Sequence, residues 1–290
     1  MAPVSSGQTQ LTLRVLDSVS DRGAHSNEDL IVKGDNVAWV IDGATSLSDG
    51  VGGASETNIQ WLLGLLNTTL SDGGSRSLMD QVAEACAVIH DDFTTRRGST
   101  TPERYEAPSA VGVGIRLSGE FLEVLSFGDC QLILQTQGDE PVHISPESQL
   151  KALDDTVIEQ AIAGTTGAEQ LWDFARRELM AQLRANRNLL NKPEGYGAIS
   201  VFGEFPTPHH HSKKPVTSGT HGLLVSDGFM ALVADYDAMS PEHMLTSAIR
   251  GGVGPLLTQL RAIEAEDSRG SKFPRLKQHD DASALLFSIG

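Results

Sequence analysis

Acidic residues recur where an extended apolar run meets a turn, at distant points of the chain. The set is Glu28, Asp29, Asp42, Asp227 and Asp280. A carboxylate at a strand end can hold a hard cation over the rim of a sheet, whereas a single Asp-Gly pair is only a turn. Five such positions in one chain predict a metal cluster assembled from distant segments, and such a cluster is a candidate reaction centre.

The chemistry of these five acids narrows both the metal and the reaction. Oxygen ligands alone favour Mn²⁺ or Mg²⁺ over zinc, which prefers nitrogen and sulfur. Magnesium keeps several waters and takes few protein carboxylates per ion, so five acids are enough for two ions. Two ions about 3.5–4 Å apart can activate a bridging water for in-line attack on phosphorus and stabilise the charge that develops on its oxygens.

A hairpin is the first element that must position these acids. Two short apolar runs, 30–33 and 37–42, are separated by the turn-prone sequence Gly-Asp-Asn, which is a hairpin signal. Folding at this turn would bring Glu28 and Asp29 back beside Asp42. The sequence therefore predicts that acids 13 or 14 positions apart converge.

The rest of the chain changes between the strand period and the helix period. Strands are expected at 11–18, 110–117, 121–127, 131–135, 196–202, 223–226 and 282–289. Helices are expected at 56–70, 78–97, within 145–190 (most strongly at 171–190), near 241–250 and at 255–266. The three strands within 110–135 are expected to form an antiparallel meander. Strand pairs followed by helices, and then by more strands and helices, favour an antiparallel α+β architecture over regular β-α-β alternation.

Domain organisation is expected to be simple. The chain shows no internal repeat and no interdomain linker, so one domain over 1–290 is predicted, with a flexible N-terminus at 1–10. The segment 206–220 is rich in Pro, His and Lys and predicts a mobile surface loop. Its triple histidine, 209–211, is interpreted as part of that loop because it has no partner ligands at structured positions.

Composition excludes several classes of function. The chain has 22 Lys and Arg against 38 Asp and Glu, a net charge of −16, which argues against sequence-independent binding to nucleic acid or an anionic membrane. The two cysteines, Cys86 and Cys130, lack metal-type spacing and favour a reducing compartment. No signal peptide and no apolar run of about 18 residues is present, so a cytoplasmic protein is expected.

Five fragments together resemble a known family. In order, they are SNED, WVIDGATS, FLEVLSFGDCQLIL, GLLVSDGFMALV and HDDASALLFSI. They resemble the motifs of the metal-dependent type 2C (PPM-type) serine/threonine protein phosphatases, in particular the bacterial members, over roughly 20–290 and most weakly over 138–220. The resemblance implies a four-layer α-β-β-α sandwich with two central antiparallel sheets and helices on both outer faces.

The resemblance also implies a role for each acid of the first ion. Asp42 corresponds to the carboxylate that bridges both ions, and the Gly43 carbonyl to a further ligand. Asp227 and Asp280 resemble ligands of the first ion. Asp281 is adjacent to Asp280, but alternation along the strand favours Asp280 as the matching position.

The second ion and a third one follow from the same resemblance. Glu28 and Asp29 resemble ligands of the second ion that act through water. Asp129, in the fragment FGDC, matches an aspartate that these enzymes can use together with Asp227 for a third ion.

Two positions depart from the family's pattern. Many relatives carry an arginine a few residues before the Glu-Asp pair, where it binds the substrate phosphate with a bidentate fork; here Arg22 and His25 are both candidates. Eukaryotic members carry a histidine as general acid two residues after the bridging aspartate, and this chain has Ala44 there. A proton for the leaving group would then come from metal-bound water, from His25 or from His279.

The expected function is hydrolysis of phosphoserine and phosphothreonine in proteins by a phosphatase with two Mn²⁺ or Mg²⁺ ions. Its partners would be a phosphorylated protein and an opposing serine/threonine kinase. The alternatives are a catalytically silent phosphoprotein-binding relative and a small-molecule phosphohydrolase on the same scaffold. Since the segment 138–195 departs from the family's usual stretch, substrate specificity does not transfer, and the oligomeric state stays open.

Overall fold

The structure is a computed structural model that describes residues 10–23, 26–47, 58–71, 76–97, 101–146, 148–165 and 170–290. Its strands are β1 (Leu13–Asp21), β2 (Asp29–Lys33), β3 (Val37–Ala44), β4 (Ser109–Ser118), β5 (Phe121–Phe127), β6 (Gln131–Gln135), β7 (Val142–Ile144), β8 (Ile199–Ser200), β9 (His209–Pro215), β10 (Thr220–Val225) and β11 (Ala282–Ile289). Its helices are α1 (Asn58–Ser71), α2 (Leu78–Arg97), α3 (Leu150–Gly164), α4 (Leu171–Glu178), α5 (Met180–Arg187), α6 (Asp227–Ala234), α7 (Pro241–Gly251) and α8 (Gly254–Glu266), with a short 3₁₀ turn at Arg104–Glu106.

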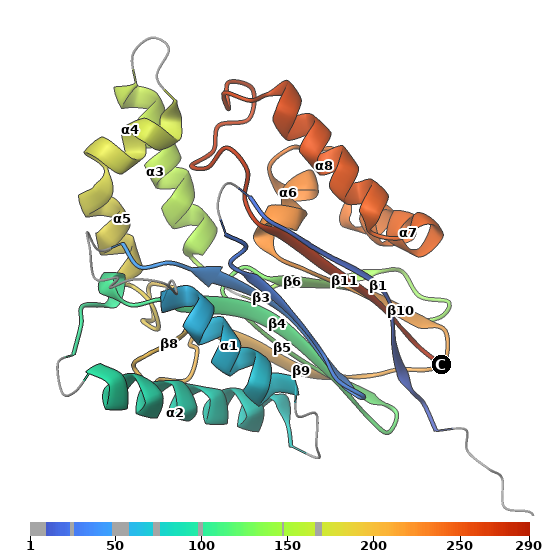
Figure 1. The fold of residues 1–290 in the computed structure, drawn as a ribbon. Coiled ribbons are helices and arrows are strands. Elements are labelled where there is room, and N and C mark those ends of the chain that lie inside the picture. Colours follow the sequence, from blue (N-terminus) through green and yellow to red (C-terminus); the bar gives the residue numbers. More distant parts are fainter. Residues whose placement is uncertain are drawn as a thin grey trace, which may run out of the picture.

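Two antiparallel sheets lie in the centre of the molecule (Figure 1). The five-stranded sheet has the order β1-β11-β10-β6-β7, and the six-stranded sheet has the order β2-β3-β4-β5-β9 with β8 paired to β4. Helices α1 and α2 cover the outer face of the six-stranded sheet, and α6, α7 and α8 cover the outer face of the five-stranded sheet. The four-layer α-β-β-α sandwich expected from the sequence is confirmed.

Alternation along β3 assigns each side chain to one of two cores. Trp39 and Ile41 pack beneath α1 and α2, whereas Ala38 and Val40 face the five-stranded sheet and share a core with its residues. Because successive side chains of a strand point to opposite faces, Asp42 belongs to the same side as Val40. The strand therefore carries an aspartate to the rim of the space between the sheets.

Helices α3, α4 and α5 form a third group beside one end of the sandwich (Figure 1). They have a small core of their own, centred on Val157, Ala161 and Ala175. Gly164 at the end of α3 lies so close to α4 that an added Cβ would be 2.2 Å from the Phe174 ring. The prediction of helices within 145–190 is confirmed, and α5 contacts the backbone that follows β3, because Arg184 Nε donates to Leu47 O at 3.0 Å and Arg187 donates to Thr45 O at 3.4 Å.

The predicted meander over 110–135 is wrong at its second turn. β4 and β5 pair as expected, but β6 pairs with β10 and β7 in the other sheet. The turn between them contains Gly128, with φ +79°, where a Cβ would be 2.3 Å from the Val111 side chain. Only glycine fits this close approach in the left-handed region. The chain thus crosses between the sheets at Asp129.

The predicted loop over 206–220 is wrong for its middle part. The segment His209–Pro215 is strand β9, which pairs with β5 at the edge of the six-stranded sheet. His211 lies 3.0 Å from the buried Glu123 carboxylate, so this histidine stabilises the strand pair. A polar sequence is compatible with a strand here because an edge strand is half exposed. The predicted flexible segment 1–10 lies, apart from Gln10, outside the described residues.

Short helix α6 is not predicted by the sequence pattern. Its residues Gly228, Phe229, Met230, Ala231 and Leu232 are all buried, so the helix has no polar face in this stretch. A short, continuously apolar run lacks the period by which a helix is recognised. The helix begins at Asp227, immediately after β10, and this places the aspartate at a strand-to-helix junction.

The two strands farthest apart in the sequence lie side by side. β1 pairs with β11 in antiparallel register from Leu13 with Ile289 to Asp21 with Ala282. Beyond the pair, Thr12 N donates to Gly290 O at 2.8 Å and Gly290 N donates to Thr12 O at 3.1 Å.

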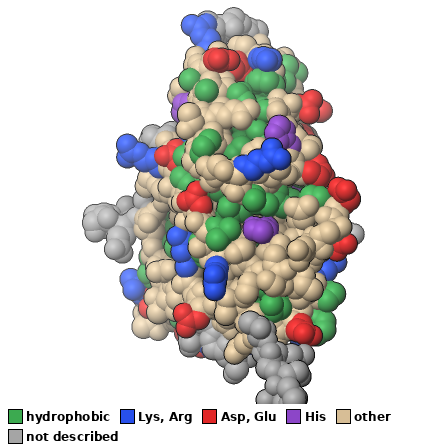
Figure 2. Space-filling view, turned by 90° about the vertical axis from the view of Figure 1, so that its right-hand side faces the viewer, with side chains coloured by type: hydrophobic (Ala, Val, Ile, Leu, Met, Phe, Trp, Pro, Cys, Tyr) green, Lys and Arg blue, Asp and Glu red, His purple; other side chains and the backbone are tan. Residues whose placement is uncertain are grey.

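Charged side chains of both signs are interspersed on the face drawn in Figure 2. No helix in the described ranges is long and apolar enough to cross a bilayer.

Candidate metal centre

The β2–β3 hairpin brings two of the predicted acids together. Asp29 and Asp42 are direct cross-strand partners, and Gly43 N donates to Glu28 O at 2.9 Å. A Cβ at Gly43 would be 2.5 Å from that same carbonyl oxygen, so this close approach requires glycine. The convergence predicted from the hairpin turn is confirmed for this pair.

Asp29 is also tied to the opposite sheet. Ser226, which follows β10, donates its hydroxyl to Asp29 Oδ2 at 3.0 Å, and Ser283 N in β11 donates to the Ser226 hydroxyl at 2.9 Å. Asp29 is 8% exposed, and its second oxygen, Oδ1, has no hydrogen-bond partner among the described residues. One oxygen therefore fixes the side chain while the other is left available at the junction of the two sheets.

Asp227 and Asp280 bring acids of the five-stranded sheet to the same place. The Asp227 side chain is hydrogen-bonded to that of Asp42, and the charge of Asp280 acts on both. Burial, and then the neighbouring carboxylates, raise the pKa of Asp42 and of Asp227 above the ordinary range. The same causes raise the pKa of Asp29 to about 8. Four acids from two sheets thus share one region, in which Asp29 is buried and the other three are half-buried.

Asp129 joins this group from the turn that crosses between the sheets. One ligand atom each of Asp42, Asp129 and Cys130 lie within 4.8 Å of one another. Burial, followed by the charge of Asp227, raises the pKa of Asp129, and its Oδ1 is buried with no partner among the described residues. Burial also raises the pKa of the Cys130 thiol, which stays neutral and lies in the core between the sheets.

Glu28 and Asp281 have structural partners of their own. The Glu28 carboxylate accepts from Thr45 N at 3.0 Å and from the Thr45 hydroxyl at 2.5 Å. Asp281 Oδ1 accepts from Gly23 N at 2.5 Å, and its Oδ2 accepts from Glu28 N at 2.7 Å. Asp281 therefore fixes the loop before β2, whereas Asp280 faces the other acids. The ligand role of Glu28 stays a prediction.

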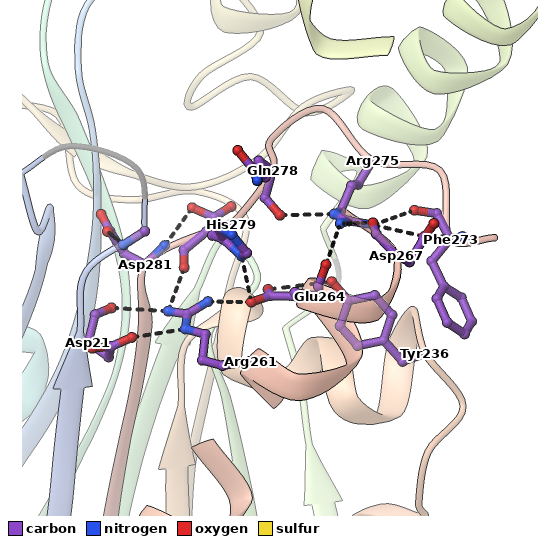
Figure 3. Close-up of polar contacts among 12 residues, drawn as sticks. Asp21, Tyr236, Arg261, Glu264, Asp267, Phe273, Arg275, Gln278, His279 and Asp281 are labelled. Carbon is purple, nitrogen blue, oxygen red and sulfur yellow. Dashed lines mark hydrogen bonds and ion pairs between the residues drawn. The ribbon is translucent and has the colours of Figure 1, made fainter. Parts of the chain in front are cut away.

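The segment before Asp280 is held by a polar network around the buried Glu264 of α8 (Figure 3). Arg261 donates to Asp21 Oδ2 at 2.9 Å, to Glu264 Oε2 at 2.8 Å and to the Asp280 carbonyl at 2.9 Å. His279 Nδ1 lies 3.0 Å from the same Glu264 oxygen, and Glu264 is 3% exposed. Because this nitrogen of His279 is committed to a buried carboxylate, the structure gives the ring a supporting role and leaves its suggested acid role without support.

The roles predicted for Arg22 and His25 in phosphate binding stay predictions. Arg22 is exposed and makes no ion pair or hydrogen bond with another described residue, and His25 lies outside the described residues. Among the described residues, Lys277 forms an ion pair with one of the acids, because its Nζ is 2.6 Å from Asp280 Oδ1. Sequence reasoning missed this lysine, because it belongs to no recognisable motif.

Helix α3 adds an acid that sequence reasoning also missed. Burial and then the charge of Asp227 raise the pKa of Asp154 to about 6, while Lys277 and Arg187 act in the opposite direction. Asp154 therefore faces the acids from the third helical group. No signal in the sequence could have found it, since the surrounding segment departs from the pattern that located the other acids.

The donor set fits hard divalent cations. Asp29, Asp42, Asp129, Asp227 and Asp280 offer only carboxylate oxygens, the ligand type that Mg²⁺ and Mn²⁺ prefer. Two of these oxygens are buried without a hydrogen-bond partner among the described residues. Buried carboxylates are normally paired or bind metals, so their gathering here is the arrangement expected of a cation site.

Known structures share the fold of this chain. No family model matches the sequence, and no curated protein matches it. The serine/threonine phosphatase PstP/Ppp of Mycobacterium tuberculosis is 15% identical with a TM-score of 0.55, over 96% of this chain and 98% of that chain. The catalytic domain of PstP in complex with two manganese ions is 18% identical with a TM-score of 0.53, over 96% and 99%.

A third structure has a similar match. The PPM Ser-Thr phosphatase MsPP of Mycobacterium smegmatis is 16% identical with a TM-score of 0.52, over 95% of this chain and 99% of that chain. At these identities the likeness concerns the fold. The chain therefore has the fold of the PPM-type serine/threonine phosphatases over nearly its whole length.

Proposed function

We propose that this chain is a metal-dependent phosphatase that hydrolyses phosphoserine and phosphothreonine in proteins. The observation that carries the proposal is the convergence of Asp29, Asp42, Asp227 and Asp280 from both sheets onto one largely enclosed region. The fold of solved serine/threonine phosphatases supports it. We also propose that the substrate is a phosphorylated protein, that a serine/threonine kinase opposes the enzyme, and that both act in the cytoplasm.

The acids have distinct parts in this proposal. Asp42 would bridge two Mn²⁺ or Mg²⁺ ions, with the Gly43 carbonyl as a further ligand. Asp227 and Asp280 would hold the first ion, and Glu28 and Asp29 would hold the second through water. Asp129 with Asp227 would hold a third ion. Bound in such a pair, the ions lower the pKa of a water nucleophile and neutralise charge on the phosphate oxygens.

Residues of the chain also determine how Asp29 would exchange its proton for a metal ion. Because the pKa of Asp29 is about 8, this carboxyl carries a proton at neutral pH, and cation binding must release it. Ser226 keeps the carboxyl in one orientation when it loses that proton, since the hydroxyl donates to Oδ2. With His279 committed to Glu264, the proton for the leaving group would come from His25 or from water.

The test is phosphate release from phosphoserine and phosphothreonine peptides and from an aryl phosphate, with and without Mn²⁺. We expect Asp42→Asn to reduce turnover more than about 100-fold, since even residues that only support metal ligands cost about 10–100-fold. Asp35→Asn is the matched control, because Asp35 is exposed at the opposite end of the same hairpin.

Three results would contradict the proposal, and two of them would favour an alternative function. Binding of phosphopeptides by the folded wild-type protein, without turnover in Mn²⁺, would indicate a silent binding module. Faster hydrolysis of nucleotides or sugar phosphates than of phosphopeptides would indicate a small-molecule phosphohydrolase. Turnover that survives Asp42→Asn would contradict the assigned centre.

A further inference from the structure

Lys277 lies in the irregular segment between α8 and β11, three residues before Asp280. Its Nζ is 2.6 Å from Asp280 Oδ1, and its charge also acts on Asp42 and Asp227. At the same time 57% of the Lys277 side chain is exposed. The lysine therefore reaches from solvent to the candidate metal ligands.

Two other cations near this region, Arg187 and Arg261, have partners of their own. Arg187 donates to Thr45 O at 3.4 Å and to the Ser109 hydroxyl at 3.3 Å, and Arg261 is held by Asp21 and Glu264. Within the described ranges, the only ion pair that involves a candidate metal ligand is the one between Lys277 and Asp280.

Metal binding must change the partner of this lysine. A divalent ion on Asp280 takes the carboxylate charge that Lys277 now neutralises, and it repels the ammonium group. Lys277 stays tethered three residues away, with a flexible stem and a side chain that is largely exposed. A phosphate ester bound at this site would place anionic oxygens near Lys277, and the ammonium group released from Asp280 could form a charge-assisted hydrogen bond with one of them.

We propose that Lys277 is a phosphate-binding residue, which neutralises Asp280 in the metal-free protein and binds a substrate phosphate oxygen once the cations are in place. The inference rests on the proposed function, and it assigns to Lys277 the task for which the sequence suggested Arg22 or His25. A lysine contacts a phosphate as a point charge, whereas an arginine can contact it as a bidentate fork. Lys277 also lies in a different segment from Arg22 and His25, between α8 and β11.

The test separates phosphate binding from metal binding. Calorimetry measures the affinity of the metal-free protein for Mn²⁺, and then the affinity of the Mn²⁺-loaded protein for inorganic phosphate. We expect Lys277→Gln to weaken phosphate binding about 10-fold or more, and to raise KM for a phosphopeptide by a similar factor with a smaller change in kcat. The Mn²⁺ affinity of Lys277→Gln should be equal or higher, because a competing cation is removed.

Two further variants complete the series. Lys277→Arg keeps a positive charge and should recover phosphate affinity to within about 3-fold of the wild type. Lys272→Gln is the matched control in the same segment, because the Lys272 ammonium lies 4.7 Å from the Phe273 ring centroid and is not paired with the acids. It should change neither affinity.

Unchanged phosphate affinity in Lys277→Gln, with tighter Mn²⁺ binding, would overturn the proposal and leave Lys277 as a counter-ion only. The proposal would fail equally if Lys277→Arg bound phosphate as weakly as Lys277→Gln does. Phosphate affinity is measured without turnover, so absence of phosphatase activity would contradict the proposed function without deciding the role of Lys277.

Discussion

Asp280 and Asp281 are neighbours in sequence with different tasks. Asp281 accepts hydrogen bonds from Gly23 N and Glu28 N, and so fixes both ends of the loop between β1 and β2. Asp280 points to the acids and Lys277. Both residues are aspartates, so their different roles come from the directions in which the backbone at the start of β11 points their side chains.

We expect Asp281→Ala to destabilise the protein by about 2–3 kcal/mol, because two backbone donors lose a charged acceptor. Asp281→Asn keeps one acceptor oxygen and should lose about half as much. Urea unfolding measures both, and Mn²⁺ affinity should fall in parallel as the loop carrying Glu28 loosens. A stability loss no larger than that of Asp35→Ala, at an exposed turn, would show that Asp281 does not anchor the loop.

At the residue scale, the sequence predicts the acids that stand at strand ends and misses those brought in by packing. Asp42 and Asp29 are found because a short turn fixes their register. Asp154 and Lys277 come from segments without a motif, and only the folded chain places them beside the acids. The sequence could not show that His279 is occupied, since its partner Glu264 lies 15 positions away on α8.

At the element scale, most of the order of strands and helices was predictable, but strand partners were predictable only for the hairpins β2–β3 and β4–β5. The alternation of apolar and polar residues predicts which face of a strand is buried, but it does not predict which strand pairs with it. The sequence of β5 and β6 therefore predicts one meander, although Gly128 sends them into different sheets. β9 was missed because its side chains are polar, as suits an exposed edge.

Helices α3, α4 and α5 should unfold locally before the sandwich does, because they share a small core of their own and, of their described residues, only Leu150 and Leu153 of α3 pack against the core between the sheets. We expect Phe174→Ala to weaken this group locally by about 2 kcal/mol and to leave the sandwich intact. Hydrogen exchange should accelerate at amides of 150–187 and remain unchanged in β3, β4 and β11.

Arg176→Ala is the control for this variant, because Arg176 is exposed on the same helix. If Phe174→Ala accelerated exchange equally in the sheets, the three helices would be part of one cooperative unit with the sandwich.

At the scale of the whole molecule, the acids make metal-free stability depend on pH. Burial raises the pKa of Asp29 to about 8 and that of Asp154 to about 6, from ordinary values near 4. Between about pH 4 and about pH 8 the folded protein binds more protons than the unfolded chain, so the free energy of unfolding falls as pH rises. The stability that the raised pKa values of Asp29 and Asp154 contribute is fully present below about pH 4 and is lost as the pH rises through about 8.

We expect the free energy of unfolding in chelator to be on the order of 2 kcal/mol higher at pH 5 than at pH 8. Urea unfolding at the two pH values measures it. Saturating Mn²⁺ should stabilise the protein mainly at pH 8, by about 2.7 kcal/mol at 100 times Kd. Asp42→Asn should reduce both effects, and Asp35→Asn should reduce neither. Metal-free stability that rises from pH 5 to pH 8 would contradict the buried carboxyl cluster.

The pairing of β1 with β11 has a mechanical consequence. Thr12 and Gly290 are hydrogen-bonded to each other at the outer end of this strand pair, and the pair runs from there to Asp21 and Ala282 beside the acids. Antiparallel hydrogen bonds lie perpendicular to the strands, so a force that pulls residues 12 and 290 apart would break them one pair at a time. The two strands should separate at low force, and the hydrogen bonds near Asp21 and Ala282, next to Asp280, would be the last in this pair to break.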